Sequence, residues 1–349
     1  VLIALYAREE LTDHQKRLIL HQATKSLDYF LEEYGEDGCC NEGAGYYRAA
    51  GLCLFNATEV LNMVTNGAFD GIYQQKIIKN IAPYIMNVHV DDRYYANFND
   101  CSPTAGRAGV REYLFAKRVG NEEMMRFAAL DHSRDNGYLN PRTENLFYRL
   151  QAAFTENEIQ KMDITKPIKK PDTYYESVGL LVARDSHYFL GVKGGNNGDS
   201  HNHNDVGSII VYKDGAPMLI DVGVETYSRK TFSEQRYEIW TMQSHYHNVV
   251  NFGTIQQLPG KEYGAQVKEL DMQQDHVSIT MELSSAYPVG TVKSYIRQVT
   301  MEKEKSITII DEIDSIPEGS CLTLMTLGEP KWDGEYLSIY NSGELKIQA

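Results

Sequence analysis

The sequence predicts two domains of different class, a helical domain followed by an antiparallel β-sandwich. Apolar residues recur with a helical period up to about residue 155, and short strand-like runs begin near residue 177. The segment between them is polar and contains Pro167 and Pro171. The 349 residues suffice for two cores. We therefore expect a helical domain over residues 1–160, a linker over 161–176 and a β-sandwich over 177–349.

The helical half is expected to consist of antiparallel helix pairs. Thr12 and Asp13 can cap a first helix that ends at Gly35, because apolar residues between them keep a 3.6-residue period. A second helix is expected from near Gly45 to Asn66-Gly67. Further helices fit residues 71–88, 107–119, 121–131 and 144–154. The loops contain Gly, Asp and Asn, which is typical of an array of helical hairpins.

The second half is expected to be built from short antiparallel strands. Strand-like runs cover residues 178–184, 188–193, 206–212, 217–222, 292–301 and 306–311. Asp214 and Gly215 separate the third run from the fourth, and an Asp-Gly pair in this position predicts a β-hairpin.

Composition excludes several classes of protein. The net charge of −14 argues against nucleic acid and anionic membranes as partners. No apolar run approaches the roughly 18 residues of a membrane-spanning helix. The five cysteines have no regular spacing, which favours free thiols and a cytoplasmic location, with a periplasmic or secreted one possible after removal of a signal peptide. The first residue is Val1, so we expect a fragment or a processed form. A homodimer is a further possibility.

One motif carries most of the predicted chemistry, the run from Ser200 to Asp205 with His201 and His203 on alternate residues. In an extended segment these two imidazoles would point to the same side. The turn at Asp214-Gly215 should fold Asp221 back toward His203.

A third element must bring another imidazole, either His247 or His245. Two imidazoles and one carboxylate fit Zn²⁺, or Mn²⁺ or Fe²⁺, with one position open to water. The remaining histidine of the pair could then transfer protons.

The helical half contains a second candidate motif, Asn41-Glu42-Gly43-Ala44-Gly45-Tyr46-Tyr47-Arg48. A tyrosine that faces a cleft can act as a general acid or base, and packing between helices is the alternative. Four basic residues could make such a cleft locally positive despite the total charge: Arg48, Arg229, Lys230 and Arg236.

Taken together, these motifs resemble the heparinase II/III-like polysaccharide lyases, which include heparin and heparan sulfate lyases and oligoalginate lyases. The H-N-H-N-D stretch at 201–205, L-I-D-x-G at 219–223, H-N at 247–248 and E-G-x-G-Y at 42–46 carry the resemblance. It spans roughly residues 37–260. It implies an (α/α) toroid, incomplete in this chain, followed by an antiparallel β-sandwich.

The resemblance also implies a function, β-elimination at uronic acid residues of an acidic polysaccharide or oligosaccharide such as heparin, heparan sulfate, hyaluronan, chondroitin or alginate. Tyr46 would then be the base and acid, with Tyr47 as its rival, and His201 would assist. The implied metal ligands are His203, Asp221 and His247, with Zn²⁺ as the expected ion and Mn²⁺ as the alternative. The implied substrate-binding residues are Glu42, Tyr47, Arg48, Arg229 and Arg236.

One part of the family pattern falls outside the chain. The family uses an Asn, or an Asn-His pair, well before the catalytic tyrosine, and that position precedes Val1. We therefore expect an N-terminally truncated toroid with impaired activity. Two other readings stay open from the residues: a metal-dependent oxygenase with His203, Asp221 and His247 as its ligand triad, and a non-catalytic carbohydrate-binding protein.

Overall fold

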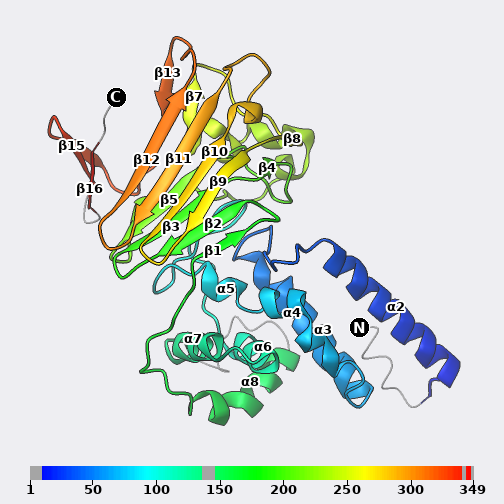
Figure 1. The fold of residues 1–349 in the computed structure, drawn as a ribbon. Helices are drawn as coiled ribbons and strands as arrows, with labels where there is room; N and C mark the ends of the chain where they lie inside the picture. The colour runs from blue at the N-terminus through cyan, green and yellow to red at the C-terminus, as the bar shows by residue number, and fades with distance from the viewer. Residues whose placement is uncertain (1–9, 136–145, 340–342, 347–349) are drawn as a thin grey trace. The chain divides into compact units, whose positions relative to one another are not determined.

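The computed structural model describes residues 10–135, 146–339 and 343–346. It divides into a helical unit and a β unit, which are described separately (Figure 1). The helical unit contains Val1–Cys40, Tyr46–Met86 and Gly106–Lys170, and the β unit contains Asn41–Gly45, Asn87–Ala105 and Pro171–Ala349. Two segments that the sequence placed in the helical domain, 41–45 and 87–105, therefore belong to the β unit.

Six α-helices of six or more residues are described in the helical unit: α2 (Asp13–Glu32), α3 (Gly51–Val64), α4 (Lys76–Ile81), α6 (Val110–Val119), α7 (Glu122–Ser133) and α8 (Leu146–Ile159). Shorter turns are η1 (Tyr46–Arg48), η2 (Asp70–Gln74) and α5 (Tyr84–Asn87). Thr12 caps α2 as predicted, because its hydroxyl accepts the Gln15 N–H while the Gln15 side chain accepts the Thr12 N–H.

The helix expected over residues 71–88 is interrupted, and this expectation was wrong in its continuity. The segment forms η2, α4 and α5 instead. Pro83 lies between α4 and α5 and has no N–H with which to continue the helical hydrogen bonds. Within the described residues, no helix is both long and apolar enough to cross a membrane.

The β unit contains two larger antiparallel sheets. The five-stranded sheet has the order β1 (Thr173–Tyr175), β2 (Leu180–Arg184), β3 (Tyr188–Lys193), β5 (Ile209–Lys213) and β6 (Ala216–Leu219). The four-stranded sheet has the order β12 (Ser306–Ile313), β11 (Tyr295–Glu302), β10 (His276–Glu282) and β9 (Gln266–Met272). The antiparallel strands confirm the predicted class of this half of the chain.

Smaller sheets and turns complete the β unit. β13 (Ser320–Leu322) pairs with β7 (Val250–Phe252), β4 (Asn196–Asn197) pairs with β8 (Gly260–Gly264), and β14 (Pro330–Trp332), β15 (Tyr336–Ile339) and β16 (Gly343–Lys346) form a three-stranded sheet. Between β6 and β7 the chain forms four 3₁₀ turns, η4 (Lys230–Phe232), η5 (Glu234–Glu238), η6 (Trp240–Met242) and η7 (Ser244–Tyr246).

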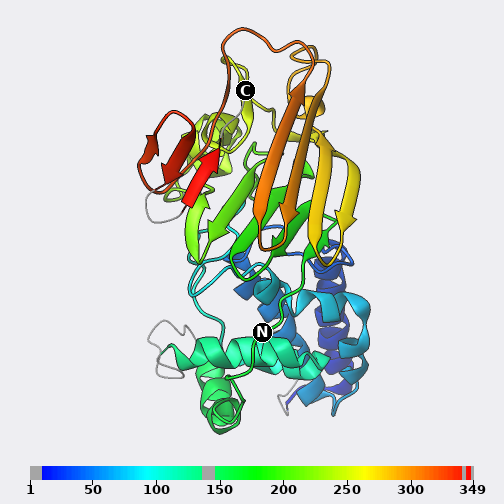
Figure 2. The ribbon, with the colours of Figure 1, turned by 60° about the vertical axis from the view of Figure 1, so that its left-hand side comes forward.

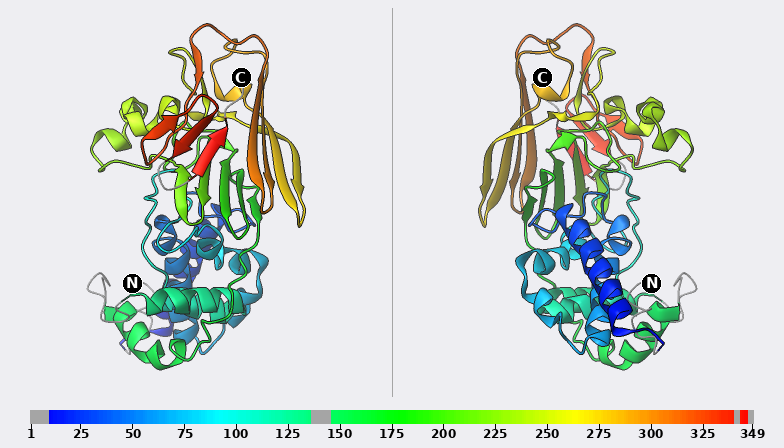
Figure 3. Two further views of the ribbon diagram at one scale, coloured as in Figure 1. Left: turned by 90° about the vertical axis from the view of Figure 1, so that its left-hand side faces the viewer. Right: turned by 90° about the vertical axis from the view of Figure 1, so that its right-hand side faces the viewer.

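The two larger sheets form two layers over one apolar core, as the turned views show (Figures 2 and 3). Leu190 and Val192 of β3 and Val277 and Ile279 of β10 are all buried in this core. Burial alternates along β10, so one face of its sheet packs inward while the other is more exposed.

The hairpin of β5 and β6 confirms the sequence prediction. Asp214 and Gly215 have φ values of 49° and 76°, as a tight hairpin turn with two left-handed residues requires. Val211 pairs with Leu219, so the residues before β5 and those after β6 come together at one end of the hairpin. That end of the sheet carries the candidate site.

Candidate metal centre and active site

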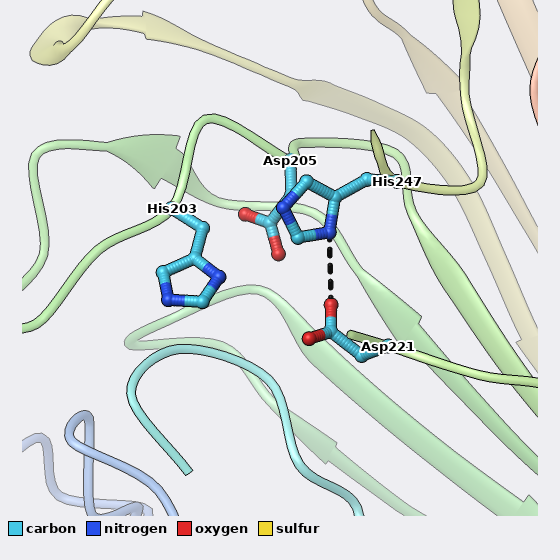
Figure 4. Close-up of side chains that lie close together, drawn as sticks. All are labelled: His203, Asp205, Asp221 and His247. Carbon is cyan, nitrogen blue, oxygen red and sulfur yellow. Dashed lines mark hydrogen bonds and ion pairs between the residues drawn. The ribbon is translucent and has the colours of Figure 1, made fainter. Parts of the chain in front are cut away.

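Four buried side chains form a compact cluster beside the β5–β6 hairpin (Figure 4). His203 and Asp205 precede β5, Asp221 follows β6, and His247 follows η7. Each residue offers one ligand atom, and these four atoms lie within 4.8 Å of one another. The cluster contains the three predicted ligands and adds Asp205, the last residue of the same motif.

Hydrogen bonds orient both imidazoles of the cluster in the same way. His247 Nε2 lies 3.0 Å from the Thr241 carbonyl oxygen, so this nitrogen carries the proton and donates. His203 Nε2 lies 3.0 Å from Asp100 Oδ1 and donates to that carboxylate. Each ring therefore keeps its Nδ1 for the cluster. An imidazole held through one nitrogen by a protein oxygen is the usual arrangement of a metal-binding histidine.

Two atoms of the cluster have no hydrogen-bond partner although they are buried, His203 Nδ1 and Asp205 Oδ2. Leaving a buried polar atom unsatisfied costs about 1–3 kcal/mol. Two imidazole nitrogens and two carboxylates are donors that suit Zn²⁺. The cluster therefore fits a divalent cation, which would satisfy both atoms.

Burial and the neighbouring charges shift the pKa values of the ionisable groups in the cluster. Burial lowers the pKa of His203. Burial also opposes charge on His247, but the Asp221 carboxylate, whose Oδ2 lies 3.0 Å from His247 Nδ1, outweighs it and raises the pKa of His247. Burial would raise the pKa of the Asp221 carboxyl, but the neighbouring His247 lowers it below its usual value. A metal ion would have to displace the proton that His247 Nδ1 shares with Asp221.

His201 lies beside the cluster but is not one of its members. Its Nδ1 is 2.8 Å from Asp100 Oδ2, and its Nε2 is 3.9 Å from Glu42 Oε2. The expected extended conformation was wrong, because His201 has a φ of 56° within a turn. His201 and His203 nevertheless reach the same carboxylate.

Asp100 is the main residue of the site that the sequence did not reveal. Its side chain is fully buried, and its Oδ1 accepts from His203 Nε2 at 3.0 Å and Arg236 Nη2 at 2.7 Å. Its Oδ2 accepts from His201 Nδ1 at 2.8 Å and the Tyr227 hydroxyl at 3.0 Å. Although burial would raise the pKa of Asp100, these hydrogen bonds hold it well below its usual range.

Lys193 is a second residue that sequence reasoning missed. It is buried, and its Nζ donates to Asp205 Oδ1 and, at 2.6 Å, to Asn99 Oδ1. Asp205 is thus held by one oxygen while the other belongs to the cluster. For Asn99 and Asp100 the available signal was the stretch from Asn97 to Asp100, in which three of four residues are polar and no helix was expected.

The predicted tyrosines lie in the helical unit, in η1. Tyr47 is fully buried and donates its hydroxyl to the Ala82 carbonyl oxygen at 2.8 Å. Burial raises its pKa well above the usual value. Tyr47 therefore stabilises helix packing, and this disfavours its predicted roles as a rival base and a substrate contact, which stay predictions. The pairing of Tyr46 with His201 stays a prediction.

The arginines predicted to bind substrate differ in their surroundings. Arg48 Nε lies 3.3 Å from Glu112 Oε1 in the helical unit. Arg236 donates to Asp100 and to the Asn202 carbonyl oxygen, so it holds the histidine loop in place. Its role as a direct substrate contact stays a prediction. Arg229 is exposed at the start of η4.

Of the two histidines considered for the third position, His247 is the one that joins the cluster. His247 is fully buried. His245 lies outside it, with Nε2 3.1 Å from the Gly253 carbonyl oxygen. Both residues flank the exposed Tyr246.

Comparison with known proteins identifies the class of the β unit. Residues 167–329 match the family model of the heparinase II/III-like C-terminal domain. Residues 167–329 are thus similar to a heparinase II/III-like C-terminal domain, which agrees with the resemblance seen in the motifs.

Solved structures show the same fold over most of the chain. A mutant of the heparan sulfate lyase HepC from Pedobacter heparinus is similar with a TM-score of 0.62 and 16% identity, over 89% of this chain and 44% of that one. A structure of heparinase III is similar with a TM-score of 0.59 and 14% identity, over 93% of this chain and 48% of that one. The chain thus spans less than half the length of these proteins. No curated protein matches the sequence.

Proposed function

We propose that this chain is the catalytic part of a lyase that cleaves uronate-containing glycans by β-elimination. The observation that carries the proposal is the hydrogen bond from His201 Nδ1 to Asp100 Oδ2, at 2.8 Å, beside a buried metal-type cluster. The heparinase II/III-like domain at residues 167–329 supports the same reaction class. The helical unit is proposed to be part of an (α/α) toroid.

The reaction needs few groups. A base removes the proton at C5 of the uronate, the electron pair forms a double bond between C4 and C5, and the C4–O4 bond breaks. The departing O4 takes a proton. Catalysis requires a base within about 3 Å of the C5 proton and a group that neutralises the uronate carboxylate.

The proposed roles follow the motifs. Tyr46, as phenolate, takes the C5 proton and returns it to O4, so that no proton is gained or lost overall. His201 assists through Nε2, because its Nδ1 proton is committed to Asp100. Glu42, with Oε2 at 3.9 Å from His201 Nε2, is proposed to contact the sugar beside this nitrogen.

Zn²⁺ is the proposed ion for the cluster, with His203, Asp205, Asp221 and His247 as its ligands. When bound, it would neutralise the buried carboxylates and cross-link the loops before β5 and after β6 and η7. Four protein groups leave no position open, which is the pattern of a structural zinc site. The same count argues against the oxygenase reading, which requires open positions on the metal.

The test is a panel of heparan sulfate, hyaluronan, chondroitin and alginate with the full-length protein, followed by ultraviolet absorbance of the unsaturated uronate. We expect a rise with at least one glycan, and we expect Tyr46→Phe and His201→Ala to abolish it. Glycan binding without any rise would make the protein a carbohydrate-binding one. Bound iron with oxygen uptake would support the oxygenase.

A further inference from the structure

We propose that Asp100 is a positioning residue that sets the protonated nitrogen of both His201 and His203 and so couples the metal cluster to the proton-transfer histidine. The catalytic consequence rests on the proposed lyase function. The effect on the two imidazoles does not, because it follows from contacts within the β unit.

The contacts divide cleanly between the two carboxylate oxygens. Oδ2 of Asp100 meets His201 Nδ1 at 2.8 Å, and Oδ1 meets His203 Nε2 at 3.0 Å. Arg236 and Tyr227 supply one further donor to each oxygen. A carboxylate offers about four lone-pair sites, so the four donors fill them all.

An ionised carboxylate only accepts hydrogen bonds. Each imidazole nitrogen that faces Asp100 must therefore carry a proton, which is Nδ1 in His201 and Nε2 in His203. The Tyr227 hydroxyl also lies 3.2 Å from His201 Nδ1, but an unprotonated Nδ1 would face the carboxylate at 2.8 Å without a hydrogen between them. When both rings are neutral, Asp100 thus selects the Nδ1-protonated tautomer of His201 and the Nε2-protonated tautomer of His203.

These opposite tautomers serve opposite purposes. His203 keeps the lone pair of Nδ1, the buried atom without a partner in the metal-type cluster. His201 keeps the lone pair of Nε2, on the side of Glu42. The same residue therefore prepares one ring to bind a metal and the other to exchange a proton.

Asp100 is itself held by groups outside the cluster. Arg236 donates to Asp100 and also, through Nε at 3.1 Å and Nη2 at 2.9 Å, to the carbonyl oxygen of Asn202, the residue between the two histidines. The Tyr227 ring stacks on His201 with an interplanar angle of 23°. The whole His-Asn-His turn is thereby fixed against one buried carboxylate.

The experiment compares Asp100→Asn and Asp100→Ala with the wild type in three readouts. These are the tautomers of His201 and His203 from nitrogen NMR of histidine-labelled protein, the Zn²⁺ affinity from calorimetry, and kcat and KM on the cleaved glycan. Peaks are assigned with His201→Gln and His203→Gln. Asp172→Asn is the matched control, because Asp172 holds Lys303 and the Arg184 N–H elsewhere in the β unit.

In Asp100→Asn an amide NH₂ replaces one oxygen. Because Arg236 demands an oxygen at the Oδ1 position, the NH₂ should face His201 and shift its proton from Nδ1 to Nε2. We expect kcat to fall by about 10²- to 10⁴-fold with little change in KM, as when an aspartate that orients a catalytic histidine is replaced. Asp100→Ala should weaken Zn²⁺ binding by about 10- to 100-fold.

An unchanged His201 tautomer in Asp100→Asn, or unchanged Zn²⁺ affinity in Asp100→Ala, would overturn the inference even if the enzyme is a lyase. If the wild type cleaves no glycan but the NMR and Zn²⁺ changes occur, the proposed function fails and the role of Asp100 in orienting the two rings stands. Asp172→Asn should leave all three readouts as in the wild type. If Asp172→Asn instead changed them as the Asp100 variants do, the effect would not be specific to Asp100 and the inference would be overturned.

Discussion

Replacing His247 by alanine should abolish metal-dependent stabilisation, whereas replacing His245 should not. The two residues form a matched pair, since they lie two positions apart and each donates a hydrogen bond from Nε2 to a backbone carbonyl oxygen. Only His247 contributes to the four-group cluster. The comparison therefore isolates the metal site from the general effect of losing an imidazole in this segment.

The magnitude follows from the cluster. Two buried atoms without partners each cost about 1–3 kcal/mol, and a bound ion relieves both. A ligand at a free concentration of about 100 times its Kd stabilises the folded state by about 2.7 kcal/mol. For a domain of about 150–250 residues, each kcal/mol shifts Tm by about 2–4 °C, so Zn²⁺ should raise Tm by roughly 5–11 °C.

The assay is thermal unfolding of chelator-treated protein with and without added Zn²⁺. The wild type and His245→Ala should show the full rise in Tm. His247→Ala should have a lower starting Tm, because the Thr241 hydrogen bond is also lost, and should show no rise. A full rise in His247→Ala, or none in the wild type, would refute the assignment of the cluster as a metal site.

Three further predictions concern packing, a buried ion pair and pH. Tyr47→Phe should lower the free energy of unfolding by about 1 kcal/mol through its lost hydrogen bond to Ala82, and should leave kcat unchanged in the absorbance assay. Asp311→Ala should lower it by about 3–5 kcal/mol in denaturant unfolding, because the buried Arg297 loses its bidentate partner; a change below about 1 kcal/mol would contradict this. Zn²⁺ affinity, from titrations at several pH values, should fall as the pH is lowered. Burial opposes charge on His247, but Asp221 raises its pKa, so the proton competes with the metal up to a higher pH than for an ordinary histidine.

Much of the fold could be predicted because its signals are local. The capping box at Thr12 and the Asp214-Gly215 turn depend on residues within a few positions of one another, and both are present. The prediction of one continuous helix over residues 71–88 was wrong for an equally local reason. The apolar periodicity continues past Pro83, but the helical hydrogen bonds cannot. The assignment of residues 41–45 and 87–105 to the β unit depends on tertiary contacts and left no periodic signal.

The candidate site divides in the same way. The approach of Asp221 to His203 follows from the hairpin, whose turn is visible in the sequence. The contact of Asp100 with His201 joins residues 101 positions apart, and that of Lys193 with Asn99 joins residues 94 apart. No pattern along the chain encodes such distances. Asp205 was not among the predicted ligands. Only the structure shows that its Oδ2 lacks a partner while its Oδ1 accepts a hydrogen bond from Lys193.

The most direct test of the account is the origin of the oxygen in the cleaved product. The full-length protein is incubated with its glycan in water labelled with heavy oxygen, and the product ends are analysed by mass spectrometry. β-Elimination predicts an unsaturated uronate at the new non-reducing end and no heavy oxygen at either new end. A saturated uronate, with heavy oxygen incorporated at the cleavage site, would mean hydrolysis and would contradict the roles assigned to Tyr46 and His201.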